Sequence, residues 1–270
     1  MGGISHITLY SGQRAKDCHD AGKKVLSFGK KHSNTRSQVV GYICIGHSHA
    51  SSGNHQEALK SYLKALQIAT DPFYTEWARV LVGISFFMLG DLIKAEEALT
   101  KVAAYIEACG CETMSSATYP ILGAIMVSKG KMSEGLDMIM KTYRTDQEKN
   151  WGFGIATGEY TLAILYSQIA QGKEKPKLTV LMKNFSFVMK NVPFALKKAE
   201  TYFQKAIETS KKYQTQGLLA QSYYNLGELY LSKNQKNSAR ACFSHAENVF
   251  KELEAEIYLA NTRRMLKKLE

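Results

Sequence analysis

Apolar side chains recur every three or four residues in two short stretches between positions 41 and 72, which is the spacing of one helix face. Between the two stretches lies SSGN (51–54), a run of turn-forming residues. Pro72 disfavours helix in the residue before it and ends the second stretch. The pattern therefore predicts two amphipathic helices joined by a tight turn. Their apolar faces comprise Tyr42, Ile45, Gly46 and His49 in the first and Ala58, Leu59, Tyr62, Ala65 and Leu66 in the second.

The same layout returns along the chain. The small residue that follows each turn falls at Ala58, Ala95, Gly135, Ala199 and Ala239, with successive separations of 37, 40, 64 and 40 residues. Three separations fit one unit of about forty residues, and the fourth is one unit plus an insertion. We expect repeat units at 39–72, 76–109, 116–150, 156–213 and 217–250, with the insertion at 172–196 carrying its own apolar pattern and forming helix or a packed loop.

Single helices are predicted at both ends of the array. Residues 13–33 place Ala15, Cys18, Ala21, Leu26 and Phe28 on or near one face, and no partner helix precedes them, so they resemble the second half of a repeat in a piece of a longer protein. Residues 251–269 read as a capping helix with a polar outer face, which the end of a stacked array needs.

Two local features are also predicted. Ser115 or Ser116 is the expected N-cap of a helix that tolerates Pro120 in its first turn. The glycine-rich segment WGFGIATGEY (151–160) is expected to be a flexible turn that opens a helix. Its third glycine comes one residue too late for the dinucleotide-binding pattern GxGxxG, and no strand precedes it.

The five recurring units resemble tetratricopeptide repeats. The resemblance covers residues 13–269 and implies an all-α, right-handed superhelix of about five helix-turn-helix units with a C-terminal capping helix. Departures from the family pattern are Gly135 in place of alanine, His49 in place of an aromatic residue, and the split fourth unit. The long units, the segment NVPFALKKAETYFQKAIETS and the C-terminal sequence also resemble the C-terminal arrays of large bacterial signalling ATPases, of the nucleotide cyclase and maltose-regulator types.

The family binds partners along a concave face lined mainly by the first helix of each unit. Carried onto this sequence, the resemblance implies a mostly apolar and aromatic groove. Chaperone-binding members clamp a terminal carboxylate with lysine, asparagine and arginine, but Ile43, Val80 and Pro120 stand at those places, so such a clamp is not expected. The implied groove residues are Ile43, His47, Trp77, Val80, Ile84, Phe87, Ala124, Tyr160, Ile164, Tyr224 and Glu228.

Charge and composition narrow the function classes. The net charge of +11 is spread over the chain, and only 4 prolines and 45% apolar residues argue against disorder. Five cysteines without a CxxC pair are expected to be reduced. The longest apolar run is too short to span a bilayer, and no signal peptide is recognisable at the N-terminus. A cytoplasmic protein with no membrane partner is expected.

Other candidate sites are weaker. His47 and His49 lie about 200° apart around a helix and cannot share a metal ion there, so His47, His49 and His55 are expected to be groove or turn residues. Cys109 and Cys111 are expected to be loop thiols. Ten lysines and three glutamates between positions 173 and 212 favour a solvated face over nucleic-acid binding, since arginine is absent there. No constellation indicates catalysis, a metal or another cofactor.

The sequence thus predicts a non-catalytic protein-interaction scaffold, the regulatory arm of a larger signalling protein. Its groove would hold an amphipathic helix or peptide, a neighbouring domain or a second copy of the chain in a homodimer. The alternative is a sensor in which a small effector lodges in the same groove, stacked on Trp77 or Tyr160, and shifts a conformational equilibrium.

Overall fold

The computed structural model describes residues 14–171, 184, 189 and 191–270. Within these residues the chain forms twelve α-helices and two short 3-10 helices and no β-strand, which confirms the all-α prediction. The helices are α2 (Ala15–Lys31), α3 (Thr35–Ser51), α4 (His55–Ile68), α5 (Pro72–Met88), α6 (Leu92–Cys109), η1 (Glu112–Met114), α7 (Ser115–Ser128), α8 (Met132–Glu148), α9 (Gly152–Gln171), η2 (Val192–Phe194), α12 (Ala195–Tyr213), α13 (Gln216–Ser232), α14 (Lys236–Glu252) and α15 (Glu256–Lys267).

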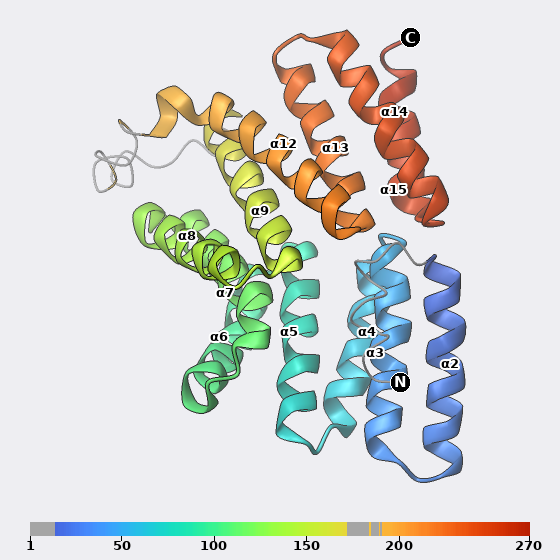
Figure 1. Cartoon of the computed structure of the whole chain (residues 1–270). Helices are drawn as coiled ribbons and strands as arrows, with labels where there is room; N and C mark the ends of the chain where they lie inside the picture. The colour runs from blue at the N-terminus through green and yellow to red at the C-terminus, as the bar shows by residue number, and fades with distance from the viewer. Residues whose placement is uncertain (1–13, 172–183, 185–188, 190) are drawn as a thin grey trace.

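Successive helices pack as pairs, α3 with α4, α5 with α6, α7 with α8, α9 with α12 and α13 with α14. The first helices also contact one another from pair to pair, α3 with α5, α5 with α7, α7 with α9 and α9 with α13. They therefore form the inner layer of a curved array, and the second helices form the outer layer (Figure 1). This layering gives the first helices the concave side, as the repeat pattern predicts.

The turns inside the pairs share one backbone conformation. Gly53, Gly90, Gly130 and Asn234 have φ values of 87°, 82°, 82° and 57°, in the left-handed region that glycine and asparagine adopt most readily. The next helix is then capped by a side chain in the first two pairs, where Asn54 accepts from the backbone N–H of Glu57 and Asp91 from that of Lys94. Sequence signals of this kind predicted the turns.

Small residues set the distance between the helices of a pair. The residues at 58, 95, 135, 199 and 239 are all buried, as predicted from their spacing. A Cβ atom added to Gly46 would lie 2.4 Å from the ring of Tyr62, and one added to Gly135 would lie 2.4 Å from the carbonyl oxygen of Gly123. The departure from alanine at Gly135 thus has a physical cause, because the α7–α8 pair approaches too closely there for a methyl group.

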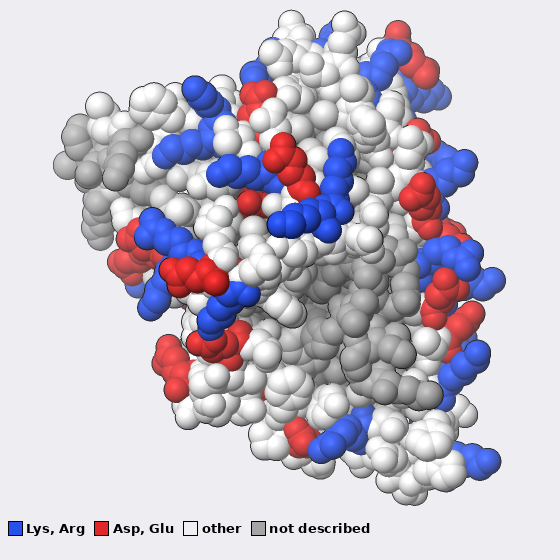
Figure 2. Space-filling view, viewed as in Figure 1, with Lys and Arg blue, Asp and Glu red and all other residues white. Residues whose placement is uncertain are grey.

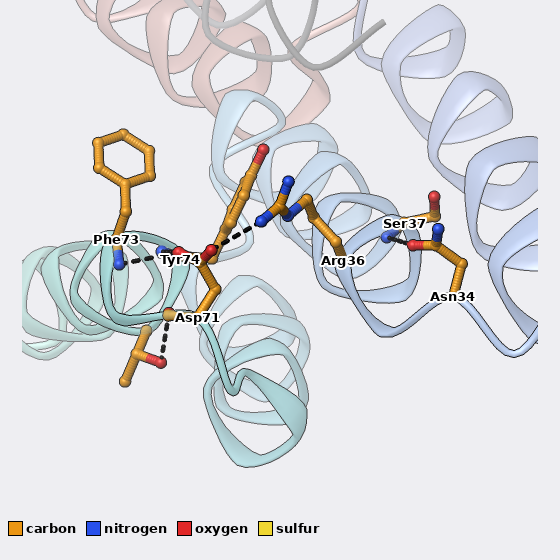
Figure 3. Close-up of polar contacts among 7 residues, drawn as sticks. Asn34, Arg36, Ser37, Asp71, Phe73 and Tyr74 are labelled. Carbon is orange, nitrogen blue, oxygen red and sulfur yellow. Dashed lines mark hydrogen bonds and ion pairs between the residues drawn. The ribbon is translucent and has the colours of Figure 1, made fainter.

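The joint between the first two pairs is polar (Figure 3). The carboxylate of Asp71 accepts from the backbone N–H groups of Phe73 and Tyr74 and so caps α5. It also pairs with the guanidinium of Arg36 at 2.8 Å, and that guanidinium lies 5.5 Å from the centre of the Tyr74 ring. One side chain therefore both caps α5 and links the start of that helix to α3.

Three local predictions are wrong. Ala21 and Phe28 are exposed, because the buried face of α2 runs through Cys18, Gly22 and Gly29. A Cβ atom on Gly22 or Gly29 would lie 2.9 or 2.7 Å from the nearest atom of α3, so these glycines let the two helices approach closely. A pattern search for apolar side chains does not count glycine as a buried position.

The start of α7 also differs from the prediction. Neither predicted serine caps the helix, which begins at Ser115 after η1, and Pro120 lies inside the helix instead of in its first turn. The hydroxyl of Ser116 donates to the carboxylate of Asp146 at 2.7 Å. Ser116 therefore links α7 to α8.

The glycine-rich segment at 151–160 is not a turn. Helix α9 begins at Gly152 and runs through the segment without interruption. Gly152, Gly154 and Gly158 are buried, and a Cβ atom on them would lie 2.2, 2.4 and 2.9 Å from Tyr213, Asp146 and Tyr143 respectively. These glycines are contact points at which larger side chains from α8 and α12 pack against the helix.

The two ends of the array meet. The backbone N–H of Ile257 donates to the carbonyl of Ser52 at 3.3 Å, and that of Ala15 donates to the carbonyl of Leu253 at 3.1 Å. His55 and Tyr258 lie in hydrogen-bond contact, and Arg14 pairs with Glu254. Figure 1 shows α15 beside the ends of α2 and α4. The predicted cap at α15 exists, but it covers the first pair as well as the last.

Candidate functional site

The residues implied as groove lining fall on the inner layer. Ile43 and His47 lie on α3, residues 77–87 of the set on α5, Ala124 on α7, Tyr160 and Ile164 on α9, and Tyr224 and Glu228 on α13. Because these helices contact one another in order, the set follows one continuous face across the array. Their participation in binding remains a prediction.

Exposure divides the set into two groups. The side chains of Ile43, His47 and Val80 are buried, with 2%, 2% and 0% of their surface exposed. His47 is held within the first pair, where its Nδ1 lies 2.8 Å from the hydroxyl oxygen of Tyr62. Half-buried side chains, which offer surface to a partner, are those of Trp77, Ile84, Phe87, Ala124, Tyr160, Ile164, Tyr224 and Glu228.

The tyrosines of this face are neutral, polar-tipped rings. The hydroxyl of Tyr160 accepts a hydrogen bond from the side-chain amide of Asn225 at 3.1 Å, and burial raises the pKa of Tyr160. Burial and the nearby Glu228 carboxylate likewise raise the pKa of Tyr224. Such groups bind apolar surface with the ring and still donate or accept one hydrogen bond.

The histidines lie in separate environments. His49 lies 5.9 Å from His19, ring centre to ring centre, and burial followed by that neighbour lowers its pKa. His55 contacts Tyr258 across the meeting of the chain ends. No group of three or more His, Cys, Asp or Glu side chains within the described part of the chain is arranged to hold a metal ion.

Two carboxyl groups are buried that the sequence did not indicate as buried. Asp146 on α8 is 6% exposed and Glu159 on α9 is 4% exposed, and burial raises the pKa of each. The Tyr143 hydroxyl donates to Glu159 at 3.1 Å and the Ser116 hydroxyl to Asp146. Both acids lie where α9 packs on α8, so their hydrogen bonds form part of the contact between the third and fourth pairs. The glycines at 154 and 158 mark this joint in the sequence.

Two clefts lined by described residues lie on the outer side, between second helices. A cleft of about 1190 Å³ separates α8 from α12, and one of about 780 Å³ separates α6 from α8 and reaches Trp151. Sequence reasoning did not find them, because they depend on how far neighbouring pairs diverge. The lysines on α12 signalled only a solvated surface.

Comparison with known families identifies the repeat. The model described as tetratricopeptide repeat matches residues 42–72 and 220–249, which lie on α3–α4 and α13–α14. The chain contains tetratricopeptide repeats. Proteins with these repeats use curved surfaces to bind other proteins or peptides. None of the described helices is long and apolar enough to cross a bilayer.

One solved structure shares the fold at low identity, and a second is reported with it. A Rap protein complexed with competence and sporulation factor matches 84% of this chain with 13% identity and a TM-score of 0.64. The present chain spans 58% of the length of that Rap protein. A signal transduction ATPase with a tetratricopeptide repeat sensor from Pyrococcus horikoshii matches 85% of this chain and 32% of its own, with 17% identity and a TM-score of 0.49. A search of curated proteins finds no match.

Proposed function

We propose that the chain is a non-catalytic protein-interaction scaffold that holds an amphipathic helix or an extended peptide along the inner layer. The observation that carries this proposal is the set of half-buried apolar and aromatic side chains on α5, α7, α9 and α13, helices that contact one another in this order. Burying two or three of them against a partner contributes roughly 1.5–3 kcal/mol each before ordering costs, which corresponds to a contact of micromolar strength.

The scaffold is proposed to be the regulatory arm of a larger signalling protein. This part of the proposal is supported by the resemblance of the C-terminal sequence to the arrays of bacterial signalling ATPases. A partner that binds one conformation of the array more tightly than another would bias the conformation of whatever is joined to the array.

A displayed random-peptide library provides a ligand for the test. Peptides selected on the wild-type chain are synthesised with a fluorescent label, and their affinity is measured by anisotropy against the wild type and against Phe87→Ala. Phe87 is half-buried on the inner layer and the substitution removes a ring from the proposed contact. We expect at least a tenfold loss of affinity with unchanged helical circular dichroism.

Phe73→Ala is the matched control. Phe73 belongs to the same helix, is 38% exposed and lies outside the groove set, with its ring directed away from the Asp71–Arg36 contact (Figure 3). The affinity of the Phe73→Ala variant for the selected peptides should differ from that of the wild type by less than twofold. A double variant, Trp77→Ala with Phe87→Ala, should abolish binding. Equal affinities of the wild type, Phe87→Ala and the folded double variant for the selected peptides would reject the groove.

A further inference from the structure

The cleft between α8 and α12 has a composition different from that of the inner groove. It lies on the outer side of the array, and its volume of about 1190 Å³ is above the 300–1,000 Å³ usual for small-ligand pockets. One wall is formed by α8 from Ser133 to Glu148, the other by α12 from Lys197 to Lys205, and Tyr166 of α9 lies between them. A wall of that length on α8 extends about 22 Å, the length of a helix of about fifteen residues.

The walls carry an excess of positive charge. Five basic side chains line the cleft, against the two carboxylates of Asp137 and Glu148. None of the five forms an ion pair with a described residue, whereas Lys60, Lys94 and Lys101 on neighbouring outer helices each pair with an acid three or four positions away. Figure 2 shows basic side chains over this part of the molecule with acidic side chains among them. The five are Lys141, Arg144, Lys197, Lys198 and Lys205.

The floor of the cleft is apolar. Leu136 and Met140 are half-buried on α8, and the rings of Tyr166 and Tyr202 stack with their centres 5.9 Å apart and their planes 6° from parallel. Phe194 stands at one end with 58% of its surface exposed. The cleft therefore offers an apolar floor between a basic wall on α12 and a wall on α8 whose basic and acidic side chains are equal in number.

The tyrosine faces are already occupied. The ammonium group of Lys198 lies 4.9 Å from the centre of the Tyr166 ring, and that of Lys205 lies 5.5 Å from the centre of the Tyr202 ring. Single-stranded nucleic acid is bound through bases that stack on open aromatic faces. With each ring covered by its neighbour and by a lysine, the arrangement favours aliphatic side chains over bases.

We propose that the α8–α12 cleft binds an acidic amphipathic helix of about fifteen residues. Its apolar face would lie on Leu136, Met140 and Phe194, and carboxylates on its two flanks would pair with the basic side chains of the walls. Charge complementarity of this kind sets orientation and raises the association rate. The cleft is separate from the proposed inner groove, so the chain would have two surfaces for partners of different chemistry.

The test uses a labelled sixteen-residue peptide with leucine at positions i, i+3, i+4 and i+7 of a helix and glutamate elsewhere. Its affinity for the whole chain is measured by fluorescence anisotropy at physiological salt. Lys141→Glu with Arg144→Glu removes both basic side chains of the α8 wall and makes that wall acidic, so it should weaken binding at least tenfold. Lys197→Glu on the opposite wall should weaken it at least threefold, which keeps the test valid if the double variant does not fold.

The control variant is Lys23→Glu with Lys24→Glu, two exposed lysines on α2 far from the cleft in sequence. It makes the same change of net charge and should alter the affinity less than twofold. Equal weakening by the α2 and cleft variants would overturn the proposal, as would failure of the peptide to bind. Tighter, cleft-dependent binding of an oligonucleotide of equal charge would assign the surface to nucleic acid instead.

Discussion

The Nε2 atom of His55 lies 2.9 Å from the hydroxyl oxygen of Tyr258, although 203 positions separate the two residues. The contact joins the start of α4, the second helix of the first pair, to the capping helix α15. Beside it, a Cβ atom on Gly53 would lie 3.0 Å from the Cβ of Ile257, so the turn and the cap are in close packing contact. The array therefore forms a closed arc, and its curvature is fixed at the ends as well as between neighbouring units.

Acidification should weaken this closure. Burial lowers the pKa of His55 in the folded chain, so the unfolded chain, with a His pKa of about 6.5, binds more protons as the pH falls. The contribution of the buried, neutral His55 to the free energy of unfolding is complete above about pH 7. It is lost as the pH drops through the unfolded-state pKa of about 6.5 towards the lower pKa of the folded state. The free energy of unfolding, measured by urea titration at pH 7.5 and pH 5.5, should fall on acidification.

His55→Gln should reduce this pH dependence. Part of the dependence will remain in His55→Gln, because the pKa of His49 is also lowered. If His55→Gln retains the full wild-type dependence, the His55–Tyr258 contact does not respond to pH.

Two phenylalanines should differ sharply in their effect on stability. Phe203 on α12 is fully buried where α9, α12 and α13 meet, so Phe203→Ala should lower the free energy of unfolding by about 3–5 kcal/mol. Phe28 is 55% exposed, and Phe28→Ala should change it by less than about 0.5 kcal/mol. Chemical denaturation of both variants measures the difference. Similar losses would place Phe28 in the core, where the sequence pattern had put it.

The polar joint at Asp71 should depend more on the cap than on the ion pair. The backbone N–H of Tyr74 is the largest cause of the lowered pKa of Asp71, ahead of the Arg36 side chain. Asp71→Ala removes both contacts, whereas Arg36→Ala leaves the cap intact. Thermal unfolding at pH 7 should show a lower Tm for Asp71→Ala than for Arg36→Ala. An equal lowering of Tm in the two variants would mean that the ion pair, and not the cap, holds the joint.

Most of the fold could be predicted from the periodicity of the sequence. The regular positions of Ala58, Ala95, Ala199 and Ala239 predicted where helix pairs pack, because a small side chain is needed wherever two helices cross closely. The contacts made at buried glycines were not predicted from the periodicity. Gly22 and Gly29 on α2, and Gly154 and Gly158 on α9, are contact points that an apolar pattern does not register.

Features that depend on global curvature were beyond prediction from the sequence. The contact between His55 and Tyr258 joins residues with no shared periodicity, and it arises because the array bends enough to bring its ends together. The cleft between α8 and α12 likewise reflects the angle between two pairs. For the proposed inner groove, the sequence indicated the helices but not which of their side chains are buried in the core, as Ile43 and Val80 are.

The most direct test of the central proposal is the hydrogen-exchange footprint of a library-selected peptide on the wild-type chain. We expect slower amide exchange in α5, α9 and α13 when the peptide is bound, since these helices belong to the inner layer and carry the half-buried residues of the proposed groove. Slowing confined to the outer helices α4, α6 and α14 would contradict the account and place the partner on the convex side.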